Sequence, residues 1–531
     1  MAAVIASEIP NNETKERADF KNNYYDDWYR NPLATGLPYE SIQAPTFDAF
    51  LPSEWKSHVT DVISRGIGQF SLNLDQYLEI TQRNNPGNLL FSPASLALAL
   101  ATILLASGGN TFNEISQVLG FDSDIDILNS SEVAHRIFGI LIHDYDKKQK
   151  QNPNFPIRKV ASGLFIQDGY PLRKQFKIAC NEIYKTEVIK VDYARDSTNA
   201  KKVINKWVSN KTMNKIQEIL TENPYPTTDI IFSSTLYFSG KWKKPFGEDT
   251  VRQPFTIGPN RTVYVDMMVQ ADNFPYYKDT ELGLKIIGLP YVGSEVMMYL
   301  ILPDDKDPSA LRRLKQELTY EKLDDLIRHM RNVECSIIIP KMDLSSSLTL
   351  REALESLGLI SLFDESCADL SLLSSGKKEE VDDEICDIPS MISMIYKPTN
   401  SNCTSNLLRR RNFKTESQSK PHGKFAEKKY VEFIKSHNFP SFGLDKLRIR
   451  GCPRNPGIWV GDIVHAIKMK VDQSGTEAAS ATLTLSGRIG SDKYFIANRP
   501  FLLFIRHNPS KNIWFWGTIY KPTPFYSNST A

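Results

Sequence analysis

The chain has 531 residues, of which 41% are hydrophobic, so it is long enough for one large core or several small ones. Its 64 Lys and Arg residues nearly balance its 62 Asp and Glu residues, and the formal net charge is +2. Because the charges nearly cancel, the protein as a whole is not attracted to a polyanion. Neither nucleic acid nor a membrane surface is therefore expected as a partner.

Residues 1–58 are predicted to form a polar and flexible N-terminal extension, because turn-forming residues dominate them. The opening sequence MAAVIASEIPNNETKERADF lacks the basic start and the sustained apolar core of a secretion signal. An aromatic and acidic stretch, YYDDWYRNP, stands out at 24–32.

From about residue 60, helical and strand patterns alternate along the chain. The apolar run LALALATILLA has the length of a buried core helix, because Ser92, Pro93 and Ser95 interrupt the longer uncharged stretch at its start. Amphipathic helices are predicted at 64–80 and 200–220. Strands are predicted at 229–242, 296–303, 335–344 and 501–508.

Residues 376–456 interrupt this pattern and are predicted to be a flexible insertion, because acidic, basic and proline-rich stretches leave little apolar surface to bury. Arg409, Arg410 and Arg411 suit either a polyanion contact or a solvated loop. Of the six cysteines, three lie here: Cys386, Cys403 and Cys452. They suit either disulfides formed in an oxidising compartment or free thiols. An apolar strand follows at 457–471.

No motif of an enzyme is present. The chain lacks a Gly-x-Ser-x-Gly elbow, a His-Glu-x-x-His helix and a phosphate-binding glycine loop, and its cysteines lack zinc spacing. His465 lies within an apolar strand, which favours a hydrogen-bonded core histidine over a catalytic one. We therefore expect no catalytic residue, no metal ligands and no cofactor.

The run GTEAASATLTLSG at 475–487 is made almost entirely of small residues and carries a single charge, at Glu477. Its alternate positions would line one face of a strand that fits a narrow space: Thr476, Ala478, Ser480, Thr482, Thr484 and Ser486. Yet Ala and Ser are poor strand formers on their own, so the run is predicted to adopt a strand without requiring one. Arg488 and Ile489 follow directly.

With this run, the chain resembles the serpins over about 60–375 and 457–523, because several stretches follow in that family's order. These are NLLFSPASLALALATILLASGGNTFNEI, STLYFSGKWKKPF, LPY, LILP, LGLISLFDESCADLS and NRPFLLFIRHNPSKNIWFWGTIYKP. The resemblance implies an α+β fold of three β-sheets and about nine helices with an exposed reactive loop. It places the serpin domain at 59–523, interrupted at 376–456, with a C-terminal tail at 524–531.

The resemblance implies suicide-substrate inhibition of a serine protease: the cleaved loop enters the main sheet while the protease is held as an acyl ester. It assigns the hinge of the loop to Gly475, Thr476, Glu477, Ala478, Ala479, Ser480, Ala481 and Thr482. It assigns the shutter, where the sheet opens, to Ser92, Ser95, Ser234 and His465. Two positions depart from the family pattern. Ser234 replaces a usual Asn, so a water is expected to close the network, and Gln473 replaces a commoner Glu.

Two positions for the cleaved bond remain open. A trypsin-like protease would cut between Arg488 and Ile489, because its acidic pocket binds a guanidinium. The usual family spacing places the bond between Ile489 and Gly490, which would suit an elastase-like pocket.

The resemblance also bears on partners and compartment. We expect a monomer that forms a covalent acyl complex with its protease, and Tyr24–Tyr29 is either an exosite for a basic protease surface or a leader without a role. Secretion is expected from the family, helped by glycan acceptors at Asn129, Asn210 and Asn260, and the alternative is a cytoplasmic protein. A non-inhibitory serpin acting as a carrier or chaperone is the first functional alternative, and a hydrolase is the second.

Overall fold

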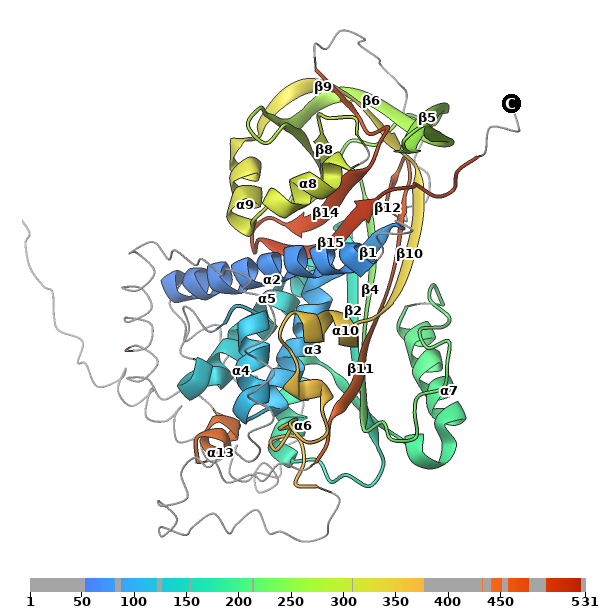
Figure 1. Ribbon diagram of the computed structural model, residues 1–531. Helices are drawn as coiled ribbons and strands as arrows, with labels where there is room; N and C mark the ends of the chain where they lie inside the picture. The colour runs from blue at the N-terminus through green and yellow to red at the C-terminus, as the bar shows by residue number, and fades with distance from the viewer. Residues whose placement is uncertain are drawn as a thin grey trace, which may run out of the picture.

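The described residues form two β-sheets, and helices pack against them (Figure 1). The computed structural model describes residues 53–81, 87–121, 127–152, 154–212, 214–307, 309–376, 432, 441–450, 457–476 and 493–526. Within these ranges, α-helices and β-strands pack together, as expected for the α+β class.

The larger sheet has nine strands. Eight of them follow the order β1 (Leu89–Phe91), β15 (Asn512–Ile519), β14 (Phe501–His507), β8 (Val296–Pro303), β7 (Leu284–Pro290), β6 (Arg261–Asp279), β9 (Arg331–Pro340) and β13 (Tyr494–Ile496), and β5 (Thr250–Gly258) pairs with β6. The prediction of three sheets is corrected here to two among the described residues. The reason is the long strand β6, which pairs with β9 along most of its length and with β7 at its end, and so joins two of the expected sheets.

The smaller, six-stranded sheet contains the candidate site. Its order is β10 (Met342–Thr349), β11 (Val460–Val471), β12 (Gly475–Thr476), β4 (Ile230–Lys241), β2 (Ile157–Gln167) and β3 (Glu187–Val191). Side chains alternate between its faces: Phe232 and Ile463 enter the main core, whereas Ile231 and Val464 pack under a helix on the opposite face. Both faces of this sheet are therefore covered, which accounts for the apolar sequences of β4 and β11.

Ten α-helices lie in the described part of the chain, against about nine expected. They are α2 (Ser53–Thr81), α3 (Pro93–Ala106), α4 (Gly109–Val118), α5 (Ile127–Gln151), α6 (Lys174–Ala179), α7 (Tyr193–Lys211), α8 (Ala310–Glu317), α9 (Tyr320–His329), α10 (Arg351–Ser356) and α13 (Leu444–Arg450). A π-helical turn at Cys180–Tyr184 and a 3₁₀ turn at Ser361–Phe363 are shorter. Among the described helices, none has the length and apolar character needed to cross a membrane.

Helix α3 confirms the predicted core helix. Every residue of Pro93–Ala106 is buried, and Ser92 caps the helix start while Pro93 occupies its first turn. Helix α7 corrects the helix predicted at 200–220, because it ends at Lys211. Beyond that point the side chain of Asn205 accepts the backbone N–H groups of Ile219 and Leu220, so these groups need no helical partner.

Two segments expected to be flexible, and the predicted C-terminal tail, contain ordered elements. Helix α2 begins at Ser53, inside the extension predicted at 1–58. Helix α13 lies inside the insertion predicted at 376–456. Tyr526, in the predicted C-terminal tail, pairs with Tyr264 of β6 through two backbone hydrogen bonds. In each case, partners distant in sequence supply the contacts that the local sequence lacks.

Candidate functional site

The candidate site is the seam between β4 and β11, by which we mean the line where these two parallel strands pair. They are neighbours from Ile230 and Val460 to Tyr237 and Lys468. Beyond that point the strands are no longer paired with each other, and the short strand β12 lies between them, antiparallel to both. The seam is therefore closed below and already occupied at its upper end (Figure 1).

At the upper end, the first two residues of the predicted hinge fill the space between the strands. Thr476 is fully buried, and its hydroxyl lies 2.8 Å from the hydroxyl of Tyr291. Tyr291 stacks on Trp242 at a centroid distance of 4.5 Å. A Cβ atom at Gly475 would lie 2.0 Å from the carbonyl oxygen of Gly240, so only glycine fits there. Small side chains are thus a steric requirement at this end.

A tight turn delivers β12 to the seam. The carboxylate of Asp472 accepts the backbone N–H groups of Ser474 and Gly475, at 3.0 and 3.2 Å. Trp242 holds the same turn from the other strand: its indole N–H donates to the carbonyl of Asp472 at 2.9 Å, and its backbone N–H donates to Ser474. The departure at Gln473 has a structural consequence, because its amide donates to the carbonyl of Glu248, which a carboxylate could not do.

At the centre of the seam, the four predicted shutter residues are in contact. The Nδ1 atom of His465 lies 2.9 Å from the carbonyl of Ser234 across the seam, and its Nε2 atom accepts the backbone N–H of Ser92 at 2.9 Å. Nδ1 is therefore the protonated nitrogen of a neutral imidazole. Burial lowers the pKa of His465 to about 4, and the hydrogen bond to Ser234 opposes this shift only in part.

Ser234 completes the network through a direct hydrogen bond to the start of α3. Its hydroxyl donates directly to the carbonyl of Ser95 at 3.0 Å, while the hydroxyl of Ser92 accepts the N–H of Ser95. The expectation of a water is corrected because β4 runs close enough to α3 for a short side chain to reach. Helix α3 is thus bonded to both strands of the seam.

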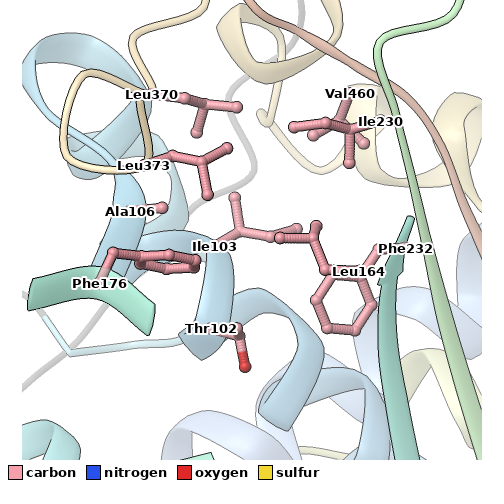
Figure 2. A pocket seen from close by; sticks show the side chains of 10 residues that line it. All are labelled: Thr102, Ile103, Ala106, Leu164, Phe176, Ile230, Phe232, Leu370, Leu373 and Val460. Carbon is pink, nitrogen blue, oxygen red and sulfur yellow. The ribbon is translucent and has the colours of Figure 1, made fainter. Parts of the chain in front are cut away.

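Below the centre lies a small apolar cavity (Figure 2). Its lining comes from α3, from α6, from strands on both sides of the seam and from the segment after α10: Thr102, Ile103, Ala106, Leu164, Phe176, Ile230, Phe232, Leu370, Leu373 and Val460. Ile230 and Val460 are the lowest paired residues of β4 and β11. The core beneath the closed end of the seam is therefore incompletely filled.

Several predicted site residues lie outside the described residues. They are Glu477, Ala478, Ala479, Ser480, Ala481, Thr482, Arg488, Ile489 and Gly490, together with Arg409–Arg411 and Tyr24–Tyr29. Trp242, Tyr291 and Asp472 were not predicted as site residues. The first two belong to the Gly-Lys-Trp and Leu-Pro-Tyr stretches that carried the resemblance, which was the available signal. In the described part of the chain, no group of three or more His, Cys, Asp or Glu side chains could hold a metal ion.

The smaller sheet thus holds the first two residues of the predicted hinge, Gly475 and Thr476, between two of its own strands. A model of the family "Serpin (serine protease inhibitor)" matches residues 65–385 and 438–522. The chain belongs to the serpin family. The matched ranges leave a gap at 386–437, narrower than the predicted insertion, and they place α13 within the family match.

Similar proteins agree with this assignment. Leukocyte elastase inhibitor of Xenopus tropicalis is 26% identical over 455 residues, covering 85% of this chain and 97% of that protein. Serine protease inhibitor 28Dc of Drosophila melanogaster is 27% identical over 491 residues, covering 87% and 80%. Uncleaved ovalbumin superposes with a TM-score of 0.64 at 19% identity, covering 87% of this chain and all of that one, which supports the fold alone.

The predicted family and the α+β serpin fold are confirmed. Mouse protein-Z dependent protease inhibitor, with a TM-score of 0.64 at 20% identity and coverage of 89% and 100%, has the same fold. Because the family consists of protease inhibitors, the chain is not an enzyme, and the hydrolase alternative is withdrawn.

Proposed function

We propose that the protein inhibits a serine protease as a suicide substrate, with the segment after Thr476 as the inserting loop. The observation that carries this proposal is the position of β12, which pairs with β4 at Gly475 and Thr476 and with β11 at Thr476. A strand continuing from Thr476 would run antiparallel to both neighbours. It would replace one parallel ladder with two antiparallel ladders, which are slightly more stable per residue.

The composition of the loop supports entry into the seam. Thr476 points into the core, so side chains two, four and six positions further along an extended strand would point the same way. Those positions are Ala478, Ser480 and Thr482. Their small size limits both the polar surface to be desolvated and the displacement of core side chains, which favours insertion over hydrolysis of the acyl ester.

The bond to be cut is proposed to join Arg488 and Ile489. The protease serine oxygen would attack the carbonyl carbon of Arg488, forming an ester as the peptide C–N bond breaks, and the amine of Ile489 would leave with a proton. The guanidinium would occupy the acidic pocket of a trypsin-like protease. The alternative, with Ile489 in the pocket and Gly490 leaving, is in line with the names of the vertebrate relatives, which concern elastase.

One experiment tests both the mechanism and the bond. The protein is mixed with trypsin and, separately, with leukocyte elastase, and denaturing electrophoresis is combined with mass spectrometry of the released peptide. A denaturant-resistant complex with trypsin and a peptide beginning IGSDKYF is expected. A peptide beginning GSDKYF would move the bond to Ile489–Gly490, and cleavage by both proteases without any complex would favour a non-inhibitory carrier or chaperone.

The proposed partner is therefore the protease, bound covalently by a monomeric inhibitor, and the proposed compartment is extracellular rather than cytoplasmic. Two observations support secretion. Cys367 is disulfide-bonded, which suits an oxidising compartment, whereas Cys180 and Cys335 are buried thiols. The glycan acceptors Asn210 and Asn260 are exposed. Removal of N-linked glycans should lower the apparent mass of the native protein, and an unchanged mass would leave no support from glycosylation.

A further inference from the structure

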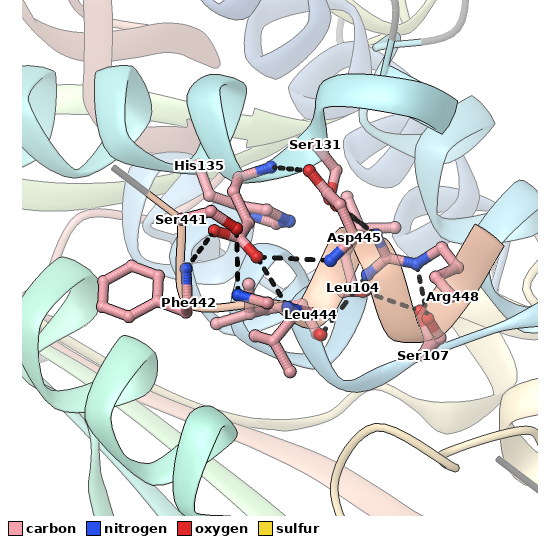
Figure 3. Close-up of polar contacts among 12 residues, drawn as sticks. Leu104, Ser107, Ser131, His135, Ser441, Phe442, Leu444, Asp445 and Arg448 are labelled. Atoms are coloured by element: carbon pink, nitrogen blue, oxygen red, sulfur yellow. Dashed lines mark hydrogen bonds and ion pairs between the residues drawn. The ribbon is translucent and has the colours of Figure 1, made fainter. Parts of the chain in front are cut away.

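Helix α13 and the turn before it, Ser441–Arg450, are docked against α3, α4 and α5 (Figure 3). This segment precedes β11 in the chain and lies within the region whose sequence predicted an unstructured insertion. We call Ser441–Arg450 the brace.

The brace and α5 exchange hydrogen bonds in both directions. The buried carboxylate of Glu132 accepts the backbone N–H groups of Phe442, Leu444 and Asp445, at 2.5, 2.7 and 3.2 Å. Asp445 in turn accepts the backbone N–H of Glu132 at 3.0 Å and the hydroxyl of Ser131. Each carboxylate thus satisfies backbone donors of the other segment, which fixes their relative position.

Arg448 connects the brace to the end of α3. The guanidinium of Arg448, whose side chain is 8% exposed, donates to the carbonyl of Ser107 at 3.1 Å and to that of Leu105 at 3.4 Å. It also donates to Ser131 and Asp445, each at 2.7 Å, and lies 4.3 Å from the ring centre of Phe112 in α4. One side chain therefore links three helices that lie on one face of the smaller sheet.

Helix α5 and the brace are connected to opposite sides of the seam. Helix α5 leads directly into β2, which pairs with β4 on one side, whereas the brace leads into β11 on the other side. Helix α3 is bonded to both sides through Ser234 and His465. An inserted strand would widen the sheet by about 4.8 Å, so α3 and α5 could not keep their present positions relative to both halves.

We propose that the brace holds α3 against α5 in the closed sheet and thereby slows strand insertion, with Glu132 and Arg448 as the positioning residues. This inference rests on the proposed function for its biological meaning. Its physical content is the rate at which the sheet opens, which can be measured without an inhibited protease.

The test compares Arg448→Met with Lys446→Met, a substitution of the same kind at an exposed position of the same helix. Each variant is cut in the loop by thermolysin, a metalloprotease that forms no acyl ester, and the gain of the more thermostable, strand-inserted form is followed over time. Uncleaved samples held below the unfolding transition report spontaneous insertion. Arg448→Met should insert roughly three- to tenfold faster than the parent in both assays, and Lys446→Met at the parental rate.

Equal or slower insertion of Arg448→Met relative to Lys446→Met would overturn the proposal. Asp445→Asn is a second variant for the case in which Arg448→Met does not fold, and it should also insert faster than Lys446→Met. If the parent inserts its cleaved loop but never traps a protease, the proposed function fails while the brace is still tested by the relative rates. If the cleaved parent never gains stability, both proposals fail.

Discussion

Strands β4 and β11 are separated at the upper end of the seam but paired directly at its centre. At the upper end, β4 and β11 are separated by Gly475 and Thr476, and the packing of Trp242 and Tyr291 makes that separation stable. At the centre the strands are paired directly, and His465 bonds across the seam. The proposed insertion would continue from the upper end, and it would have to break the parallel pairing of β4 and β11 together with the hydrogen bond between His465 and Ser234.

The largest expected effect comes from a charge at the upper end. Thr476→Arg would place a guanidinium in a fully buried position without a charged partner. Burying such a charge costs on the order of several kcal/mol of free energy. Insertion should become slower than ester hydrolysis, and the number of inhibitor molecules consumed per trapped protease should rise more than about tenfold. Thr476→Ser is the control and should inhibit like the parent. An unchanged stoichiometry in Thr476→Arg would show that this residue does not need to enter the sheet.

The second effect is removal of the central bond. His465→Phe would remove the buried hydrogen bonds that the imidazole makes with the N–H of Ser92 and the carbonyl of Ser234, at about 2–4 kcal/mol of unfolding free energy. The native form should unfold at a lower denaturant concentration and insert its uncleaved loop sooner. Lys468→Gln, on the same strand but partly exposed, should do neither. If His465→Phe is as stable as the parent and inserts its loop as slowly, the bonds of His465 do not hold the sheet closed.

The third prediction uses pH to separate the seam from the rest of the fold. Burial lowers the pKa of both His465 and His507 to about 4. Since the unfolded state binds more protons than the folded state between about pH 6.5 and 4, the free energy of unfolding should fall as the pH falls through this range. His465 should contribute roughly 3 kcal/mol of that fall.

The matched variants His465→Gln and His507→Gln test whether the two buried histidines cause this loss of stability. Each variant should show a shallower loss of stability between pH 6.5 and 4, because one buried imidazole is removed. Protonation of His465 would remove its acceptor for the N–H of Ser92, so we expect acid to promote insertion. This acid effect should be diminished only in His465→Gln, since His507 bonds to Ser510 and Glu295 away from the seam. Identical insertion behaviour of the two variants would contradict a special role for the centre.

The smallest effect concerns the hydroxyl pair at the upper end. Tyr291→Phe removes the partner of Thr476 while preserving the stacking on Trp242, and should cost about 1 kcal/mol. A double-mutant cycle with Thr476→Val, read by denaturant unfolding, should give a coupling energy of similar size. A coupling near zero would mean that packing alone seats the hinge.

Much of this arrangement could be predicted from the sequence, for identifiable reasons. The uniformly apolar α3 and the apolar strands β4 and β11 have no other stable environment than a covered core, and the family resemblance brought the four shutter residues to one place. The local sequence could not show that β6 joins two expected sheets, because strand pairing depends on register between distant segments.

The brace shows the same limit more sharply. Phe442 and Leu444 belong to a short apolar stretch, FPSFGLDKLRI, inside a region otherwise rich in prolines and charges, and the carboxylate that bonds to their backbone, Glu132, is distant in the sequence. The closing role of Ser234 was likewise missed, because the distance between β4 and α3 decides whether a short hydroxyl reaches its acceptor.

The most direct test of the central claim, that the small-residue run enters the seam, is a comparison of thermal unfolding before and after the loop is cut. Cleavage within 477–492 should raise the unfolding temperature sharply, because the freed run would pair with both β4 and β11 along the whole seam. Equal unfolding temperatures for the native and cleaved forms would contradict insertion, and with it inhibition by strand addition.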